Sequence, residues 1–414
     1  MTKEFGYSQV IVEAKKGKLL RTVINNVGVS TKSFLKYKEI SEGLLSEGIY
    51  DQTWLQQREM PPVFNSQGLV RAVDLFAGCG GLSVGVREAC RALQLDFEAV
   101  LAVDFDSTVL ETYASNFPEA SIVCQPIEDL IDGKIGSPLT PKELKLKRKL
   151  GVIDIVIGGP PCQGHSALNN HTRHRDPKNE LYLIMARFCE IIRPRHVVIE
   201  NVPGVLSDSL NVAQRTWDAL SKLGYSVDSG VIDASKIGVA QRRKRSITVA
   251  SLDGTPLISA VIKNAELPNR PLRWAIGDLA KRRLVDCVYD SAPSPSVENS
   301  RRINYLFDNN LHDLPDEERP DCHRLKAHTY KSVYGRMYWD KPAQTITTGF
   351  GSMGRGRNVH PRFRRTITPH EAARIQFFPD FFRFETELRT QLQKMIGNAV
   401  PSKLGYVIAL YLFA

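Results

Sequence analysis

Short runs of β-branched and other apolar residues alternate with longer segments of helical spacing in the middle of the chain. The apolar runs predict strands at 69–76, 98–104, 120–125, 153–159, 196–202, 225–233 and 246–251. The segments between them, among them 107–116, 180–192 and 210–223, predict helices. Because right-handed crossovers cover both faces of a parallel sheet with helices, the alternation predicts an α/β, doubly wound domain with a mostly parallel, seven-stranded sheet.

The segments on either side of this domain have different patterns. Residues 1–68 contain two alternating runs, YSQVIVEA and KLLRTVINN, and then a helical stretch that ends at Pro61-Pro62. We interpret them as an N-terminal extension or a small accessory domain of unknown role. After Ser251 the rhythm stops, so residues 252–365 predict a separate domain that is irregular or built on a small sheet. Helical patterns return at TPHEAARIQ and again from Ser402, in the C-terminal segment 366–414.

Composition narrows the class of protein. With 42% hydrophobic and 24% charged residues the chain is neither disordered nor fibrous, and its net charge of +10 suits a polyanionic partner. The first residues, MTKEFGYSQ, form no apolar signal, and the apolar run 405–414 is too short to span a membrane. Seven cysteines without a C-x-x-C pair indicate neither a disulfide framework nor a zinc ribbon. We therefore expect a cytoplasmic protein without membrane segments.

A glycine-rich turn follows the first strand of the predicted domain. In DLFAGCGGLSVG, Gly78, Gly80 and Gly81 allow a tight turn and a close approach of a ligand to the backbone. Asp104 ends the second strand, where an acidic side chain can accept hydrogen bonds from ribose hydroxyls. The spacing differs from G-x-G-x-x-G, so a pyrophosphate is not indicated. The pattern favours a nucleotide-like cofactor, and a simple strand-to-helix turn is the alternative.

A cysteine and a glutamate follow the next two strands of the predicted sheet. Cys162 lies in GGPPCQGHS, between two prolines and a polar loop, whereas Cys124 and Cys189 lie in apolar runs. This context is typical of a thiol that must ionise and be reached by a substrate. Glu200 ends the following strand. The sequence therefore predicts a nucleophile and an acid at neighbouring strand ends, facing one pocket.

The order of these motifs resembles that of the DNA (cytosine-5) methyltransferases. DLFAGCGGLS, GGPPCQGHS, VVIENV, QRRKR and IGNAVP follow one another in the family's order, and the resemblance covers about 69–251 and 340–414. It implies a catalytic domain at 69–251 with the sheet of S-adenosylmethionine-dependent methyltransferases, and a smaller target-recognition domain at 252–365. The segment 366–414 would return to the catalytic domain.

The resemblance also implies the reaction. The family transfers a methyl group from S-adenosyl-L-methionine to carbon 5 of a flipped-out cytosine in double-stranded DNA, through a covalent cysteine adduct at carbon 6. Cys162 would be that nucleophile, and Glu200 would stabilise the charge that develops on the N3 side of the ring. Arg243 and Arg245 match the family's Arg-x-Arg and would hold the carboxylate and the base. No side chain is assigned to removal of the carbon-5 proton.

For the cofactor, the resemblance assigns residues in six separate stretches of the chain: Phe76, Ala77, Gly78, Gly80, Leu82, Asp104, Phe105, Ile127, Pro160, Leu181, Asn398 and Ala399. Two positions depart from the family's pattern. Asp104 stands where the family more often has Glu, a shorter side chain that can still bind ribose hydroxyls. Pro126 stands where an Asp commonly meets the adenine amino group, which leaves that contact unassigned although Asp129 is nearby.

For DNA, two loops carry the expected contacts: Gln163, Ser166, Arg173, Arg175, Arg355 and Arg357. The loop after Cys162 would clamp the target base and contact phosphates. The glycine- and arginine-rich segment 348–365 has few apolar anchors, and Arg355 or Arg357 could pair with a guanine in the major groove. The alternative is a flexible basic surface loop. His165, His171 and His174 lack a cysteine or carboxylate at ligand spacing, so we predict no metal.

Two other functions are compatible with these motifs. One branch of the family methylates transfer RNA, and a protein of this fold could bind DNA without catalysis. The arginine-rich recognition region favours duplex DNA, and the presence of each catalytic motif favours an enzyme. Bacterial self-marking alongside a cognate restriction or other defence system is the use that the resemblance implies. The recognised bases, the oligomeric state and the role of residues 1–68 do not follow from the sequence.

Overall fold

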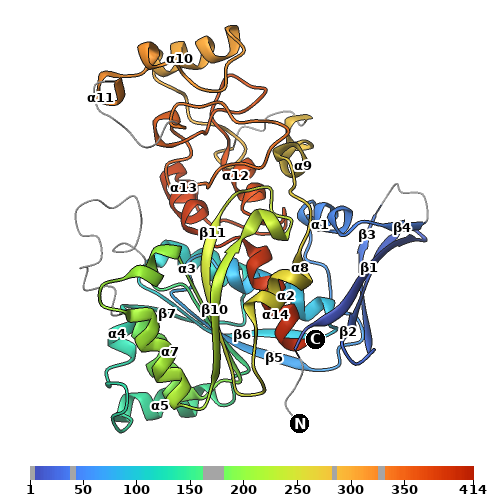
Figure 1. Ribbon diagram of the computed structural model, residues 1–414, viewed down its shortest axis with the longest axis vertical. Coiled ribbons are helices and arrows are strands. Elements are labelled where there is room, and N and C mark those ends of the chain that lie inside the picture. Colours follow the sequence, from blue (N-terminus) through green and yellow to red (C-terminus); the bar gives the residue numbers. More distant parts are fainter. Residues whose placement is uncertain (1–4, 38–42, 162–180, 282–286, 325–331) are drawn as a thin grey trace.

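A seven-stranded sheet forms the centre of the computed structural model, which describes residues 5–37, 43–161, 181–281, 287–324 and 332–414 (Figure 1). Its strand order is β10-β11-β9-β8-β5-β6-β7. The strands are β5 (Leu69–Leu75), β6 (Asp96–Asp104), β7 (Ser121–Cys124), β8 (Ile155–Gly158), β9 (His196–Asn201), β10 (Ser226–Asp233) and β11 (Lys244–Ser251). Strand β11 runs antiparallel to both of its neighbours, β9 and β10, and the other pairs of adjacent strands in this sheet are parallel. The predicted mostly parallel, seven-stranded sheet is therefore confirmed.

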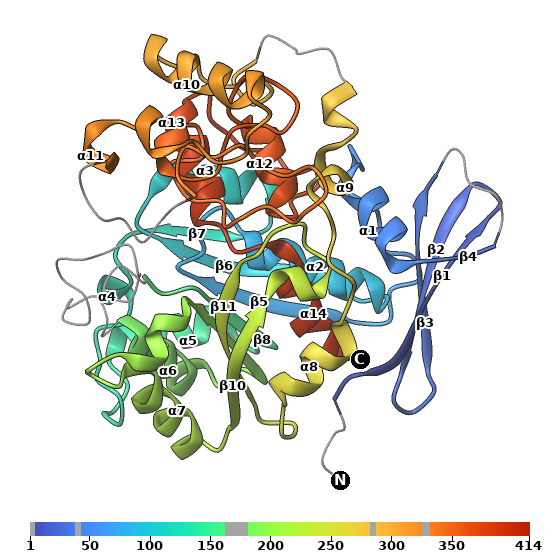
Figure 2. The same cartoon turned by 45° about the horizontal axis from the view of Figure 1, so that its top comes forward.

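Helices cover both faces of the sheet, as the doubly wound prediction requires (Figure 2). In β8, Ile155 and Ile157 lie in one hydrophobic core and Val156 lies in the other, because successive side chains of a strand alternate between faces. The first core contains α2 (Gly81–Ala92), α3 (Ser107–Asn116) and α14 (Ser402–Phe413). The second contains α4 (Ile127–Leu130), α5 (Pro141–Leu150), α6 (Leu181–Ile192) and α7 (Val212–Lys222).

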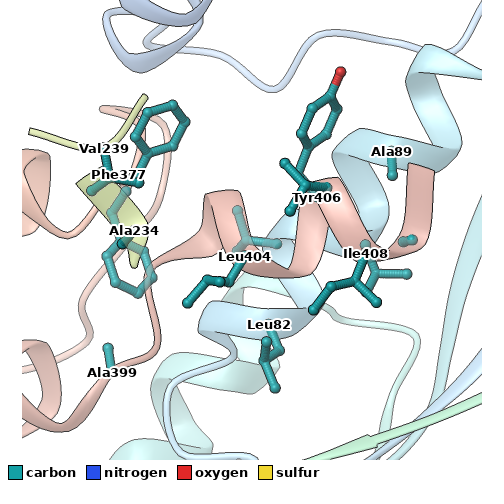
Figure 3. Packing of buried hydrophobic residues seen from close by; sticks show 14 of the residues in the cluster. Leu82, Ala89, Ala234, Val239, Phe377, Ala399, Leu404, Tyr406 and Ile408 are labelled. Atoms are coloured by element: carbon teal, nitrogen blue, oxygen red, sulfur yellow. The ribbon is translucent and has the colours of Figure 1, made fainter. Parts of the chain in front are cut away.

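The last helix, α14, packs closely against α2, which follows the glycine turn (Figure 3). A Cβ atom at Gly85 would lie 1.9 Å from the carbonyl oxygen of Ser402, and one at Gly405 would lie 2.4 Å from that of Leu82. The backbones can approach this closely only because both positions are glycine. The two ends of the sheet domain's sequence therefore meet at one helix pair.

The apolar C-terminal segment lies inside the fold. Arg389–Phe413 has the length and composition of a membrane-crossing helix, but 78% of its apolar window is buried in the protein. The segment also comprises two helices, α13 (Arg389–Asn398) and α14, separated by a break before Pro401. Its hydrophobicity is accounted for by the protein core.

Residues before the central sheet form a second, antiparallel sheet of order β3-β2-β1-β4, followed by a helix. Its elements are β1 (Tyr7–Lys15), β2 (Lys18–Asn25), β3 (Ser30–Lys36), β4 (Gly43–Leu45) and α1 (Glu47–Leu55). The two alternating runs form β1 and β2 as expected, whereas β3 and β4 were not predicted. The helix ends at Leu55, before Pro61. Figure 2 shows this sheet beside α2.

A buried ionic cluster joins the N-terminal sheet to α2. Glu88 of α2 accepts hydrogen bonds from Arg21 of β2 at 2.8 Å and from Arg91 at 2.7 Å. All three side chains are at most 8% exposed. Arg91 also donates to the hydroxyl of Tyr50 in α1, and Arg21 donates to that of Tyr406 in α14. The N-terminal sheet is therefore packed onto the helix pair of the central domain.

The region after β11 consists of short helices joined by irregular segments. It contains α8 (Ile258–Ala265), α9 (Leu272–Ile276), α10 (Val297–Asp308) and α11 (Asp321–Arg324), and α12 (Pro369–Ile375) follows it. It also contains the short 3-10 turns η4 (Leu279–Lys281), η5 (Asp316–Glu318) and η6 (Met353–Arg355), whereas η2 (Pro203–Ser207) and η3 (Ala234–Ile237) lie before β11. Within its described residues this region has isolated bridges and no ladder of strands. Helix α8 follows residue 252 but packs on β10 of the central sheet. The predicted boundary between the catalytic and the target-recognition domain at 252 therefore stays a prediction.

Replacing Glu88 tests the ionic cluster. Glu88→Gln leaves Arg21 and Arg91 without their carboxylate, and we expect a loss of about 3–5 kcal/mol in the free energy of unfolding at pH 7. Urea denaturation measures it. Glu98→Gln is the control, because the Glu98–Arg71 pair is 35% and 30% exposed and contributes about 1 kcal/mol or less. Equal losses in the two variants would contradict a larger contribution of the buried cluster to the free energy of unfolding.

The same variant changes the response to acid. Burial alone would raise the pKa of Glu88, but Arg91 and Arg21 outweigh burial and lower it from the ordinary value of 4.5. Glu88 therefore stabilises the fold above that pH, and this contribution disappears as the pH falls through the lowered folded pKa. The difference in the free energy of unfolding between wild type and Glu88→Gln, measured by urea denaturation at a series of pH values, should therefore shrink as the pH falls through the lowered pKa of Glu88.

Candidate active site

A cavity of about 300 Å³ opens at the carboxyl ends of β5, β6, β8 and β9 and is closed by the junction of α13 and α14. In open α/β sheets ligands bind at this edge. Nine of the twelve residues expected to bind the cofactor line it: Phe76, Ala77, Gly78, Leu82, Asp104, Phe105, Pro160, Asn398 and Ala399. Glu200 and Arg245 line the same cavity. One pocket therefore contains predicted cofactor and catalytic residues together.

The glycine turn forms the floor of the cavity in an unusual backbone conformation. Phe76 has a φ of +58°, Gly78 of +52° and Gly80 of +91°. A positive φ is costly for a phenylalanine, and such outliers cluster at functional sites. The amide of Ala77 donates to the carbonyl oxygen of Val103 at 3.0 Å, which ties the turn to β6.

Asp104 links the turn to the loop that follows β6. Its Oδ2 accepts the amide of Gly78 at 2.9 Å, and its Oδ1 accepts the amide of Asp106 at 3.1 Å. Burial raises the pKa of Asp104, although these backbone hydrogen bonds oppose the shift. Each carboxylate oxygen has a further lone pair with which it can accept a hydroxyl in the cavity. Asp104 can therefore both shape the turn and hold a diol.

The neighbour of Asp104 is an exposed aromatic residue. The side chain of Phe105 is 69% exposed although it is large and apolar, and it lies at the cavity wall. A flat apolar ring in this position offers a stacking surface to a planar ligand group. The cavity therefore combines an acceptor for hydroxyls with a surface for a heterocycle, which fits a nucleoside.

Glu200 and Arg245 form an ion pair at the opposite side of the cavity. Arg245 Nε lies 2.6 Å from Glu200 Oε1, and the side chains are 12% and 10% exposed. Antiparallel pairing of β11 with β9 sets Ile247 opposite Glu200, so Arg245 extends just beyond the end of β9. A Cβ atom at Gly159 would lie 3.2 Å from Glu200 Oε2, so glycine leaves room beside the carboxylate.

Asn201 holds the segment that leads to the predicted nucleophile. Its Nδ2 donates to the carbonyl oxygen of Pro160 at 3.2 Å, and its Oδ1 accepts the amide of Val202. Pro160 and Pro161 line the cavity. The predicted site residues that follow them lie outside the described residues: Cys162, Gln163, Ser166, Arg173 and Arg175. The chain therefore reaches the cavity immediately before Cys162.

Four of the described residues expected at the cofactor and catalytic sites do not line the cavity. Ile127 is 4% exposed and lies in the core on the other face of the sheet, where Leu181 packs against it. Gly80 is the N-cap of α2, and its Cβ would lie 3.0 Å from the rings of Tyr113 and Phe117. Arg243 is 2% exposed and donates to backbone carbonyl groups rather than pointing to Glu200. The predicted contact of Arg243 with the base is not tested by these hydrogen bonds and stays a prediction.

The arginine-rich segment is better anchored than the sequence suggested. Phe350, Met353 and Val359 are at most 2% exposed, so the expectation of few apolar anchors is wrong. Arg357 is 9% exposed, donates to the carbonyl oxygen of His312 at 2.6 Å and pairs with Asp313. These contacts occupy its guanidinium within the fold, whereas Arg355 is exposed. The expected guanine contact is kept for Arg355 alone.

Two acidic or nucleophilic residues of the cavity were not singled out from the sequence. Asp74, inside the glycine motif, is buried and accepts a hydrogen bond from Ser83 at 2.7 Å. Burial raises its pKa well above the ordinary value. Cys79 also lines the cavity, but burial raises the pKa of its thiol to about 12, so it stays protonated. Cys79 is therefore unsuited to act as the nucleophile.

Within the described residues no group of three or more His, Cys, Asp and Glu side chains could hold a metal ion. The five described cysteines, Cys79, Cys90, Cys124, Cys189 and Cys287, are free. His165, His171 and His174 lie outside the described residues.

Comparison with known proteins shows the family of the chain. The family C-5 cytosine-specific DNA methylase matches residues 70–414. The Type II methyltransferase M1.BsuMI of Bacillus subtilis is 46% identical over 95% of this chain and 92% of its own. M.DdeI of Desulfomicrobium norvegicum, also a Type II methyltransferase, is 28% identical over 81% and 87%. The S. pombe Dnmt2 methyltransferase, 18% identical, superposes with a TM-score of 0.56 over 83% of this chain and 98% of its own.

Replacing Asp104 tests the cavity as the cofactor site. Asp104→Asn replaces one acceptor oxygen with an amide that cannot accept from a backbone N–H, which should distort the turn and remove a hydroxyl partner. We expect the Kd for S-adenosylhomocysteine, measured by calorimetry, to rise at least tenfold. Asp96→Asn, at the exposed start of the same strand, should leave it within twofold. An unchanged Kd in Asp104→Asn would exclude this cavity.

Proposed function

The chain belongs to the C-5 cytosine-specific DNA methylase family, and from this premise we propose the course of its reaction. The protein is a DNA (cytosine-5) methyltransferase, as the motif order indicated. We propose that it methylates a flipped-out cytosine in double-stranded DNA through a covalent adduct with Cys162. The observation that carries the proposal is that one cavity is lined by the Glu200–Arg245 pair, by the glycine turn and by Asp104.

The family's dependence on S-adenosylmethionine gives the cofactor, and we propose that this cavity holds it. The residues fit a nucleoside. Asp104 would accept the ribose hydroxyls, Phe105 would stack on the adenine, and the turn at Gly78 would accommodate the remaining part of the molecule. S-adenosylmethionine supplies an electrophilic methyl group. The adenine amino group has no assigned partner, since Pro126 precedes α4 at the position where the family often has Asp.

Cys162 and Glu200 would activate the cytosine ring. Carbon 5 is a poor nucleophile, so the Cys162 thiolate first forms a bond to carbon 6, and the electron pair of the C5–C6 bond becomes available at carbon 5. Glu200 would share a proton with N3 and thereby stabilise the developing charge. Arg245 holds Glu200 at 2.6 Å and would face the base's O2. After methylation, loss of the carbon-5 proton restores the C5–C6 double bond as the Cys162 sulfur leaves.

The proposal requires the target base to leave the duplex. A stacked cytosine cannot present carbon 6 to a thiolate, and rotation out of the helix costs a few kcal/mol. We propose that Gln163, Ser166, Arg173 and Arg175 contribute to the clamp and phosphate contacts. Arg355 is proposed to read a base or contact a phosphate from the recognition region, because it is exposed on η6.

A biological setting follows from the relatives. M1.BsuMI and M.DdeI are Type II methyltransferases. We propose that this protein marks DNA in the cytoplasm against a cognate restriction or other defence nuclease.

Replacing the proposed nucleophile tests the function. The wild-type protein should transfer label from S-adenosyl[methyl-³H]methionine to carbon 5 of cytosine in duplex DNA, and bisulfite sequencing should identify one sequence context. Cys162→Ala should abolish transfer, because no other described cavity thiol ionises. Cys124→Ala, at an exposed strand end, should retain activity. Wild-type turnover in Cys162→Ala would refute the adduct, and methylation of RNA in preference to DNA would refute the substrate.

Replacing Glu200 separates its chemical role from a structural one. Glu200→Gln keeps the side chain's size but has no acidic proton to share with N3, so the rate of methyl transfer should fall by about 100-fold or more. The Kd for S-adenosylhomocysteine should change by less than twofold. A matched loss of cofactor affinity and rate would show that Glu200 maintains the cavity and takes no part in the chemistry.

A further inference from the structure

The C-terminal end of α13 forms one wall of the cavity, and residues 395–397 and Ala399 there are buried whereas Asn398 is exposed. The helix ends at Asn398, and α14 begins only at Ser402. Asn398 and Ala399, at this end, line the cavity. The last carbonyl groups of a helix have no partner within it, and leaving them buried without donors would cost free energy. Donors from elsewhere in the chain are therefore needed to hold this wall.

Arg243 supplies two of these hydrogen bonds. Its Nη2 donates to the carbonyl oxygen of Gly397 at 3.2 Å and to that of Ala399 at 3.0 Å. Its Nη1 donates to the carbonyl oxygen of Ile346 at 2.8 Å, in the segment that returns from the recognition region. The guanidinium also places a positive charge at the negative end of the helix dipole. One side chain thus joins β11, the recognition region and the cavity wall.

Two glutamines complete the arrangement. Gln376 donates through Nε2 to the carbonyl oxygens of Ile396 at 2.7 Å and Ala399 at 3.2 Å. Gln241 donates to Gln376 Oε1 at 2.7 Å and accepts the amide of Ile346 at 2.7 Å. Both glutamines are 0% exposed. Side chains from segments more than 130 residues apart therefore satisfy a single helix end.

We propose that Arg243, Gln241 and Gln376 are positioning residues, which cap α13 and fix the 398–399 wall of the cofactor cavity against the start of β11. Arg245, the partner of Glu200, lies two residues beyond Arg243. The cap therefore holds the base side and the cofactor side of the cavity in one geometry. This role differs from the base contact that the Arg-x-Arg resemblance implied for Arg243. The inference rests on the proposed placement of the cofactor in this cavity.

Gln376→Met tests the cap, because it keeps the volume of the side chain and removes the amide. We expect the Kd for S-adenosylhomocysteine to rise about tenfold in calorimetry, although Gln376 does not line the cavity. In turnover, the KM for S-adenosylmethionine should rise by a similar factor, with a change of less than threefold in kcat at saturating cofactor. Arg243→Lys keeps one charge and fewer donors, and it should weaken binding in the same direction.

Arg187→Lys is the matched control. Arg187 is also buried and donates to the backbone carbonyl groups of Ser137 and Pro138, but it lies on the other face of the sheet, in α6. Its replacement should lower the melting temperature and leave the Kd within twofold. If Gln376 contributed only to global stability, Gln376→Met would likewise lower the melting temperature and leave the Kd within twofold.

The outcomes separate the cap from the proposed function. A folded Gln376→Met that binds S-adenosylhomocysteine within twofold of wild type overturns the cap, provided that Asp104→Asn weakens binding. If Asp104→Asn also binds normally, the cavity itself is wrong. If Gln376→Met does not fold, Arg243→Lys decides by the same criterion. A tenfold rise in Kd with normal binding in Arg187→Lys supports the cap.

Discussion

The close contact between α2 and α14 is the constraint on which the cavity depends. Gly85 and Gly405 leave no space for a side chain between the two helices, so their backbones lie at a fixed separation. Both helices begin at the cavity, α2 after the glycine turn and α14 after the 398–399 wall. A Cβ atom at Gly81 would lie 2.5 Å from the carbonyl oxygen of Val400, so the start of α2 also packs against the segment that precedes α14. A cavity that is lined by segments from opposite ends of this sequence depends on such a joint.

Buried arginines carry much of the remaining organisation. Arg21 joins the N-terminal sheet to Glu88 of α2, Arg243 donates to carbonyl groups at the end of α13, and Arg357 joins the segment 348–365 to His312 and Asp313. The guanidinium has five donors in a planar fork, so one side chain can satisfy several carbonyl or carboxylate groups at once. A protein with a net charge of +10 therefore uses part of its arginine content internally. The basic composition overstates the number of arginines that can reach DNA.

The N-terminal sheet contributes to the same body. Arg21 of this sheet and Tyr50 of α1 contact α2, while Lys403 at the start of α14 pairs with Asp51 of α1 at 2.8 Å. The outer side of the helix pair that supports the cavity is thus covered by residues before the central domain. Alternation in the sequence predicted β1 and β2 but not β3, because STKSFLK has only two large apolar residues and is defined by pairing with β2. The helix α1 ends at Leu55, before the predicted end at Pro61-Pro62, and an irregular segment follows it.

The sequence by itself determined the seven strands of the central sheet, their helices and the order of the motifs, because these follow from local periodicity and from residues adjacent in the chain. It also predicted Asp104 and Glu200 at the carboxyl ends of parallel strands, which lie at one edge of the sheet and line one cavity. Arg245 lines the same cavity because the antiparallel strand β11 begins at that edge. The tertiary structure alone decided that Arg243 and Arg357 turn inward while Arg245 and Arg355 do not. An arginine's role depends on which carbonyl groups lie within its reach, and those groups belong to segments such as 346 and 397–399 that are distant in sequence.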